Sequence, residues 1–193
     1  MEDRRPIFTV DWEPWFAGVL PPREWASLDQ RVREPTLFLL DLLSKYKVRG
    51  VFFILGWLRE NNFELYCEIR NRGHLVGNHS FWHQRGEGPD KEGGEGDFRS
   101  PYWSGGDFPG PCGGFFMRLL PYELWVQFVK KCGQVYVHPH DLDESHPKLK
   151  SPWLDWKRHV GLNTARWKLE RLLKEVPFGD SHCDSLYSLR NAI

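Results

Sequence analysis

The stretch GVFFILG, residues 50–56, is a continuous apolar run with a glycine at each end. A strand buried on both faces has this pattern, and such strands belong to parallel sheets that helices cover. Upstream, EPTLFLLDLLSKY (34–46) places leucines at helical spacing, with Pro35 suited to the first helical turn. Further upstream, PIFTVD (6–11) is predicted to be a short buried strand that ends at Asp11. The chain therefore opens with a strand, a helix and a second strand.

The same alternation continues downstream. NNFELYCEIRNRG is predicted to be a helix that Gly73 terminates, and HLVGNH a strand that delivers His79 at its end. The later predicted elements are a helix at 121–133, a strand QVYVH at 134–138 and a helix at 163–176 with Asn163 as N-cap. Strands alternating with helices predict an α/β fold with a largely parallel sheet.

Composition narrows the class of protein. At 193 residues we expect a single domain over 1–193. The 26 basic and 26 acidic residues balance, which argues against partners held by net charge, such as nucleic acid or a membrane surface. No apolar run approaches the ~20 residues of a membrane span, and the start MEDRRPIFTVDWEP lacks a signal-peptide core, so we expect a cytoplasmic protein. The four scattered cysteines are expected to be reduced thiols.

Two patterns raise a functional question. GNHSFWH (77–83) holds His79 and His83 four residues apart, so on a helix both rings would share one face and suit one metal ion. Chance pairs on solvated faces are the alternative. The chain also has ten tryptophans, whose broad apolar faces suit sugar rings or bases, although packing in the core explains many of them equally well.

Chemically useful residues gather where predicted parallel strands end, which is where such sheets build their sites. Asp11 and Glu13 can both reach a site there only if the strand gives way to a turn, which Pro14 favours. Glu13 with His79 and His83 would form a three-ligand site with open positions, as in hydrolytic zinc sites. Asp11 would then be free to act as a base.

These clusters resemble the motifs of the polysaccharide deacetylases, carbohydrate esterase family 4, and most closely the branch associated with bacterial exopolysaccharide synthesis. VDWE (10–13), FFILG (52–56) and GHLVGNHSFWH (73–83) stand in the order of that branch. RSPY (99–102), GGFFMRLLPY (113–122), YVHPHDLD (136–143) and RHVGLNTARWKLERLL (158–173) resemble its remaining blocks. The resemblance covers roughly residues 7–178.

The resemblance implies a metal-dependent hydrolase that removes acetyl groups, most readily N-acetyl groups of amino sugars, from an oligo- or polysaccharide. It implies one divalent ion, with zinc favoured, held by Glu13, His79 and His83, whose bound water attacks the acetamide carbonyl. It assigns the other roles as follows: Asp11 as base, Arg99 to orient it, the Tyr102 main-chain N–H to hold the oxyanion, and His138 as acid. Trp12, Trp82, Trp103 and His140 are the expected substrate contacts.

Three departures from the family pattern matter. Glu13 stands where most members have Asp. Only residues 84–98 separate His83 from Arg99, too few for the βαβ unit of about 30 residues that the family carries there. We therefore expect an abridged, incompletely closed (β/α) barrel of about five strands instead of the usual seven. Finally, His140 and Asp141 replace the Trp-Glu of the branch, so two histidines compete for the acid role, and we expect His140 to be solvated and protonated beside Asp141 and Asp143.

Three other functions stay open at this point. A carbohydrate-binding protein with a vestigial metal site would share the same residues. Two histidines and one carboxylate also form the triad of ferrous oxygenases, although the parallel α/β pattern argues against their double-sheet roll. A hydrolase of a small non-sugar amide is the third alternative.

Overall fold

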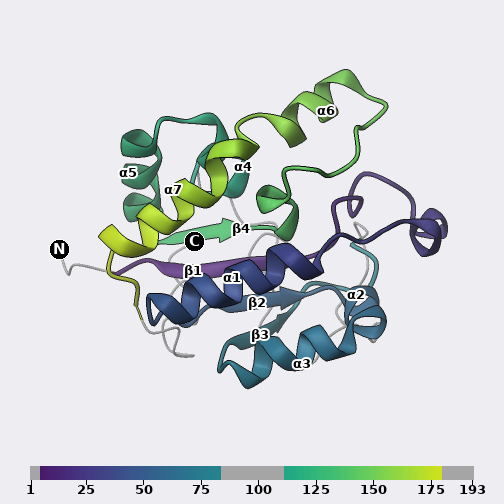
Figure 1. Ribbon diagram of the computed structural model, residues 1–193, viewed down its shortest axis with the longest axis horizontal. Helices are drawn as coiled ribbons and strands as arrows, with labels where there is room; N and C mark the ends of the chain where they lie inside the picture. Colours follow the sequence, from purple (N-terminus) through teal and green to yellow (C-terminus); the bar gives the residue numbers. More distant parts are fainter. Residues whose placement is uncertain (1–4, 84–110, 180–193) are drawn as a thin grey trace.

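A computed structural model describes residues 5–83 and 111–179 of the protein. Four strands, all pairing in parallel, form one sheet in the order β3-β2-β1-β4 (Figure 1). The strands are β1 (Ile7–Trp12), β2 (Val51–Ile54), β3 (Leu75–Asn78) and β4 (Gln134–Val137). The predicted parallel α/β fold is confirmed, and the sheet is open rather than closed into a barrel.

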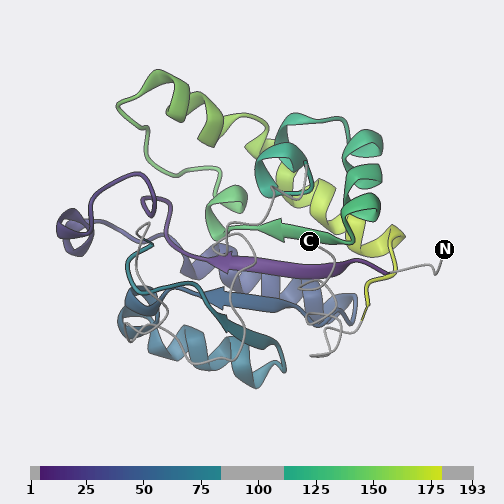
Figure 2. The ribbon, with the colours of Figure 1, turned by 180° about the vertical axis from the view of Figure 1, so that it is seen from behind.

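Helices join the strands and cover the sheet. They are η1 (Pro22–Ser27), α1 (Arg33–Lys45), α2 (Gly56–Asn61), α3 (Phe63–Asn71), α4 (Gly114–Leu119), α5 (Tyr122–Cys132), η3 (Pro139–Leu142), α6 (Pro152–His159) and α7 (Leu162–Glu175). In Figure 1, α1 and α7 lie in front of the strands, and in Figure 2, seen from behind, they lie behind them. Both helices therefore cover the same face of the sheet.

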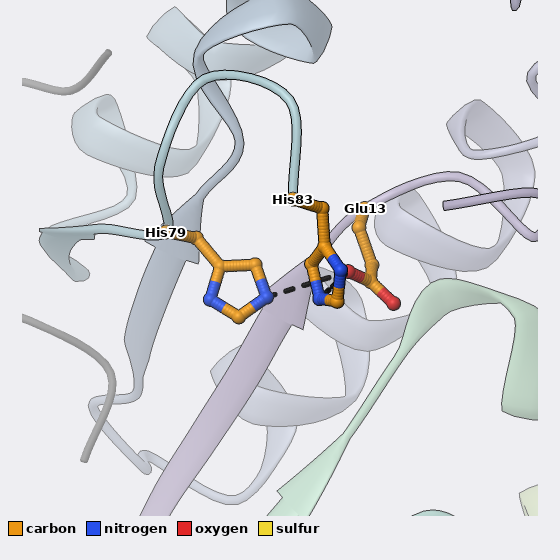
Figure 3. A group of neighbouring side chains, drawn as sticks. All are labelled: Glu13, His79 and His83. Carbon is orange, nitrogen blue, oxygen red and sulfur yellow. Dashed lines mark ion pairs between the residues drawn. The ribbon is translucent and has the colours of Figure 1, made fainter. Parts of the chain in front are cut away.

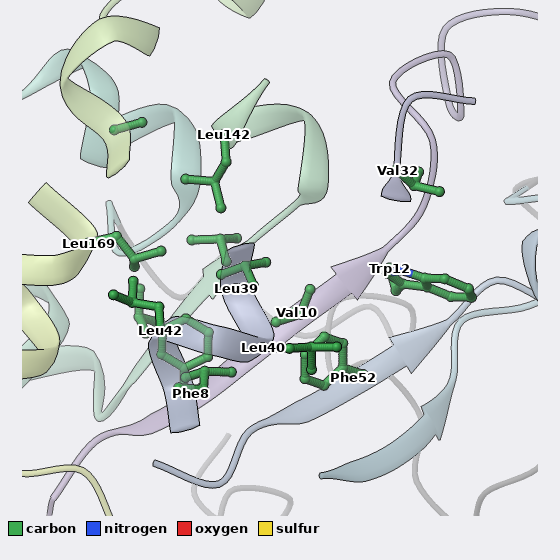
Figure 4. Close-up of a cluster of buried hydrophobic side chains, with 14 of the residues drawn as sticks. Phe8, Val10, Trp12, Val32, Leu39, Leu40, Leu42, Phe52, Leu142 and Leu169 are labelled. Atoms are coloured by element: carbon green, nitrogen blue, oxygen red, sulfur yellow. The ribbon is translucent and has the colours of Figure 1, made fainter. Parts of the chain in front are cut away.

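The core lies between the sheet and these helices (Figure 4). Every residue of β1 and β2 is buried, as the apolar run at 50–56 predicts. Phe8, Val10 and Phe52 of the strands meet Leu39 and Leu40 of α1, and all five side chains are fully buried. At about 1.5–3 kcal/mol for each such side chain, this contact is the main term that fixes the sheet on α1.

Several details differ from the sequence predictions. Four strands are described where about five were expected. Asn163 is not the N-cap of the last helix, because α7 begins at Leu162 after Gly161, whose φ of +67° is left-handed. The proline-bearing stretch before it contains α6, which was not predicted. By contrast Gly73 does end α3, with a φ of +83° that favours glycine.

Among the described residues, no helix combines the length and the apolar character needed to cross a bilayer. Cys67, Cys112 and Cys132 form no disulfide within the described residues.

Candidate metal and catalytic centre

The carboxyl end of β1 delivers two carboxylates to one place. The backbone N–H of Glu13 donates to the backbone carbonyl of Asp11 at 3.0 Å, which closes a tight three-residue turn around Trp12. This turn is the predicted break of the strand. Alternation alone would put both side chains on one face of the sheet, and the turn carries Glu13 beyond the last strand residue to the edge of the sheet. Both are buried, Asp11 at 5% and Glu13 at 3% exposure.

Two imidazoles from the end of β3 face Glu13 (Figure 3). Oε2 of Glu13 lies 3.3 Å from Nε2 of His79 and 3.0 Å from Nε2 of His83, and the two ring centroids are 5.0 Å apart. The helical reasoning for this pair is wrong, because residues 79–83 form a loop in which Ser80 and His83 have φ of 63° and 57°. The loop folds back on itself and brings the rings together by another route.

The donor set fits a divalent metal ion. One ligand atom from each of Glu13, His79 and His83 lies within 4.8 Å of the other two. Burial alone raises the pKa of Glu13, but His83 and His79 outweigh it and lower this pKa well below its usual range. The carboxylate is therefore ionised and ready to bind. Oδ1 of Asp11 is buried without a hydrogen-bond partner in the described part of the chain, as expected of a group that awaits a ligand.

His138 follows β4 and faces the two carboxylates from the opposite side. Its Nε2 lies 3.8 Å from Oδ2 of Asp11 and 3.8 Å from Oε1 of Glu13. Its Nδ1 and its backbone N–H both lie 2.9 Å from Oδ2 of Asp141, whose Oδ1 accepts from Nε of Arg118 at 3.0 Å. Burial lowers the pKa of His138, but the hydrogen bond and charge of Asp141 outweigh it, so the pKa is raised. This is the environment of a proton donor.

His140 differs from its prediction. It is buried rather than solvated, at 4% exposure, and its ring stacks on that of His138 with 4.6 Å between centroids and 22° between planes. Burial, with Arg158 beside it, lowers the pKa of His140 well below its usual value. Nε2 of His140 contacts the Arg158 guanidinium. The prediction that the charges of Asp141 and Asp143 keep His140 protonated is therefore wrong. Burial of the ring and the adjacent Arg158 cation outweigh the attraction of the aspartates.

His138 and the groups around it, here called the acid side of the centre, depend on residues that the sequence reasoning missed. The sequence predicts Asp141 only as a neighbour of His140 and not as the partner of His138, and it predicts no role for Arg118 or Arg158. One signal was available: Gly114 in the GGFF motif has no room for a side chain, because an added Cβ would collide with the Asp141 carboxylate. The glycines of the GGFF motif therefore mark a place where another part of the chain, here the Asp141 carboxylate, packs against the backbone.

The expected substrate contacts have mixed outcomes. Trp12 is fully buried and its Nε1 donates to Oγ1 of Thr36 at 3.0 Å, so its assignment as a sugar contact is wrong. Trp82 is partly exposed and packs edge-on against Trp25, at 5.8 Å between ring centroids. Arg99, Tyr102 and Trp103 lie outside the described residues.

A pocket of about 420 Å³ opens beside the acid side. His138 and His140 line it together with residues from α4 and α6, chiefly Phe115, Arg118, Lys157 and Arg158. In Figure 1, α6 lies toward the end of the sheet at which the strand arrows point. The pocket thus extends from the candidate centre along α6.

Comparisons with known proteins cover the two halves of the chain separately. Residues 25–100 match the polysaccharide deacetylase family, and residues 106–184 match a domain of unknown function, DUF3473. Glu13 and Asp11 precede the first match, and His138 lies in the second. The first segment contributes β2 and β3 and the second contributes β4, and β1 joins them into one sheet.

One curated relative and one solved structure are similar. Peptidoglycan-N-acetylmuramic acid deacetylase PdaA of Bacillus subtilis is 40% identical over 45 residues, which span 23% of this chain and 17% of that protein. A Mycobacterium smegmatis structure described as a polysaccharide deacetylase aligns with a TM-score of 0.55 at 12% identity, covering 100% of this chain and 92% of that one. The structural likeness concerns the fold, and the sequence similarity to polysaccharide deacetylases is carried by residues 25–100 and by the 45-residue match to PdaA.

Proposed function

We propose that this protein is a metal-dependent hydrolase that removes N-acetyl groups from amino sugars of an oligo- or polysaccharide. One observation carries the proposal: the donor set Glu13, His79 and His83 faces Asp11 and His138 across a few ångströms. A metal-ligand set, a free carboxylate and a raised-pKa imidazole are the three parts that amide hydrolysis needs. The similarity of residues 25–100 to the polysaccharide deacetylase family supports deacetylation as the reaction.

Zinc is the ion that best suits two imidazoles and one carboxylate with open positions. When bound, it would activate water and stabilise negative charge on the acetyl oxygen. Glu13, His79 and His83 would hold it, and the longer arm of Glu13 replaces the Asp of most family members without leaving the site.

Asp11 and His138 would divide the proton transfers. Asp11 would accept the proton of the attacking water, since its carboxylate is buried beside the ligand set without a partner for Oδ1. His138 would donate the proton on Nε2 to the leaving nitrogen as the C–N bond breaks. Asp141 supports this role because it holds Nδ1 of His138 and so directs Nε2 to the site.

The remaining roles are proposed from the family resemblance. Arg99 would orient Asp11, and the main-chain N–H of Tyr102 would hold the developing oxyanion. Trp82, Trp103 and His140 would contact substrate. We also propose that residues 1–193 form one catalytic domain, because β4 pairs with β1 within a single sheet, and that the acetylated glycan resembles those of exopolysaccharide synthesis.

The test combines two measurements on purified protein. Metal content is determined by mass spectrometry, and acetate release is followed on a soluble N-acetylglucosamine oligomer. We expect one zinc per chain and acetate release that chelation abolishes and zinc restores. His74→Asn, at the far end of β3, is the matched control for the loss of a histidine. This variant should retain both the bound zinc and acetate release.

Other outcomes separate the alternative functions. Oligomer binding with zinc but without acetate release would indicate a carbohydrate-binding protein. Stoichiometric iron, lost on replacing His79, would indicate the ferrous triad. Acetate release from a small amide but not from any oligomer would indicate a non-sugar substrate.

A further inference from the structure

The pocket beside His138 carries an excess of basic side chains. Arg118, Lys157 and Arg158 line it, against one acidic residue, Asp141. Arg118 is held by the protein: its Nε donates to Asp141, and its Nη1 donates to the backbone carbonyls of Lys157, Arg158 and Val160, at 2.8–3.2 Å. The charges of Lys157 and Arg158 are therefore the ones that this pocket presents to a ligand.

Arg158 lacks a negative partner in the part of the chain described. Its guanidinium contacts the ring of His140, a neutral acceptor, and no carboxylate of residues 5–83 or 111–179 lies within ion-pair distance. Burial lowers the pKa of Arg158, which shows that its charge is partly desolvated. The charges of Glu13 and Asp141 offset this lowering in part, but neither carboxylate pairs directly with the guanidinium, so an incoming anion would relieve the cost of burying the cation.

Lys157 lies beside three aromatic side chains, of which Phe115 lines the pocket and two tryptophans border it. The ammonium of Lys157 lies 5.3 Å from the centroid of the Phe115 ring, and Phe115 meets Trp156 edge-on at 6.3 Å. Trp156 in turn stacks on Trp153 at 5.0 Å, and both tryptophans are exposed, at 44% and 65%. Basic groups next to an exposed aromatic wall suit a sugar ring that bears an acidic substituent.

We propose that this pocket binds a carboxylate-bearing sugar adjacent to the acetylated residue, so that the substrate is an acidic glycan. The proposal rests on the proposed function, because His138 lines the same pocket and a sugar held there neighbours the reacting amide. Arg158 would take the carboxylate in a bidentate contact, with Lys157 as the second cation. The aromatic wall would hold the ring face.

Two soluble oligosaccharides of equal length test the proposal. One is an oligomer of N-acetylglucosamine, and the other alternates N-acetylglucosamine with glucuronic acid. Dissociation constants are measured by calorimetry on the zinc-loaded protein, together with acetate release. We expect the acidic oligomer to bind about tenfold more tightly, which is the worth of one charge-assisted contact. Equal affinity for both oligomers would overturn the proposal.

Three variants locate the effect. Arg158→Gln and Lys157→Gln should each remove most of the preference for the acidic oligomer. Lys157 is exposed, so its variant tests the pocket even if the loss of Arg158 disturbs His140. Lys150→Gln, another exposed lysine near α6 that does not line the pocket, is the charge-matched control and should keep the preference. An undiminished preference in both pocket variants would also overturn the proposal.

The design separates this proposal from the proposed function. Acetate release from both oligomers at equal kcat/KM, unchanged in Lys157→Gln, would retain the deacetylase and reject the acidic substrate. Tight, Arg158-dependent binding of the acidic oligomer without acetate release would reject the deacetylase and retain the anion-binding pocket.

Discussion

A loss of activity at acid pH can come from the catalytic groups or from unfolding of the protein. The buried imidazole of His74 is the group that we expect to unfold the protein as the pH falls. It is buried, at 7% exposure, just before β3 and at the opposite end of that strand from the metal ligands. Its Nδ1 accepts the backbone N–H of Gly50 at 3.1 Å, and its ring lies 5.1 Å from that of Phe52. Its Nε2 has no partner among the described residues.

Protonation of His74 is expected to destabilise the fold. Burial, with the charges of Arg72 and Arg49 nearby, lowers the pKa of His74 from 6.5 to about 4. Because the unfolded chain keeps the ordinary pKa, it binds the proton first as the pH falls. The stabilising contribution is therefore complete above pH 6.5 and is lost as the pH falls toward 4. Proton linkage gives a loss of about 2 kcal/mol at pH 5 and about 3 kcal/mol at pH 4.

Urea unfolding followed by tryptophan fluorescence from pH 8 to pH 4 measures this loss. His74→Asn is the matched variant, because its side-chain oxygen replaces Nδ1 as acceptor for Gly50 and does not titrate. All other titrating groups are common to both proteins, so the difference between the two unfolding free energies isolates His74. Between pH 8 and pH 4, the unfolding free energy of the wild-type protein should fall by about 3 kcal/mol relative to that of the variant. A difference constant to within about 0.5 kcal/mol would refute the reasoning.

The remaining predictions concern the centre. His83→Ala should lose zinc but keep the fold, because its side chain is only partly buried, and one zinc per variant chain would show that the ligand set is wrong. Asp11→Asn should keep zinc and lose ~10²–10⁴-fold in acetate release, whereas normal turnover would reject it as base. His138→Ala should lose more in kcat than His140→Ala, and the reverse order exchanges the acid assignment. Asp141→Asn should lower the unfolding free energy by ~3–5 kcal/mol, because its buried guanidinium partner loses its counter-charge, and unchanged stability in urea would contradict this.

The sheet and its helices were predictable because the sequence patterns there are local. The apolar run at 51–54 predicts a strand buried on both faces, and the helical spacing of Leu39, Leu40 and Leu43 predicts the buried side of α1. The turn after β1 was also predictable, since Pro14 cannot donate a hydrogen bond to a strand ladder and favours a turn there.

Predictions that needed long-range packing were the ones that failed. His140 has acidic neighbours in the sequence, but in the fold Arg158, eighteen residues away, contacts its ring. Trp12 stands in a functional motif, yet Thr36 of α1 captures its indole N–H in the core. His79 and His83 have helical spacing, and the left-handed residues of their loop bring the rings together instead. In each case, a partner distant in sequence or a loop conformation decided the outcome.

The guanidinium of Arg118 joins the carboxylate behind His138 to the last carbonyls of α6. Gly161 allows this arrangement, because a side chain there would collide with the Arg118 carbonyl. Randomising α6 to select for a new glycan would therefore also disturb Arg118 and, through Asp141, the position of His138. Libraries that keep Arg118 and Gly161 fixed and vary only the outward positions, such as Trp153, should recover altered selectivity with turnover intact. Libraries that shift the last turn of the helix should lose both together.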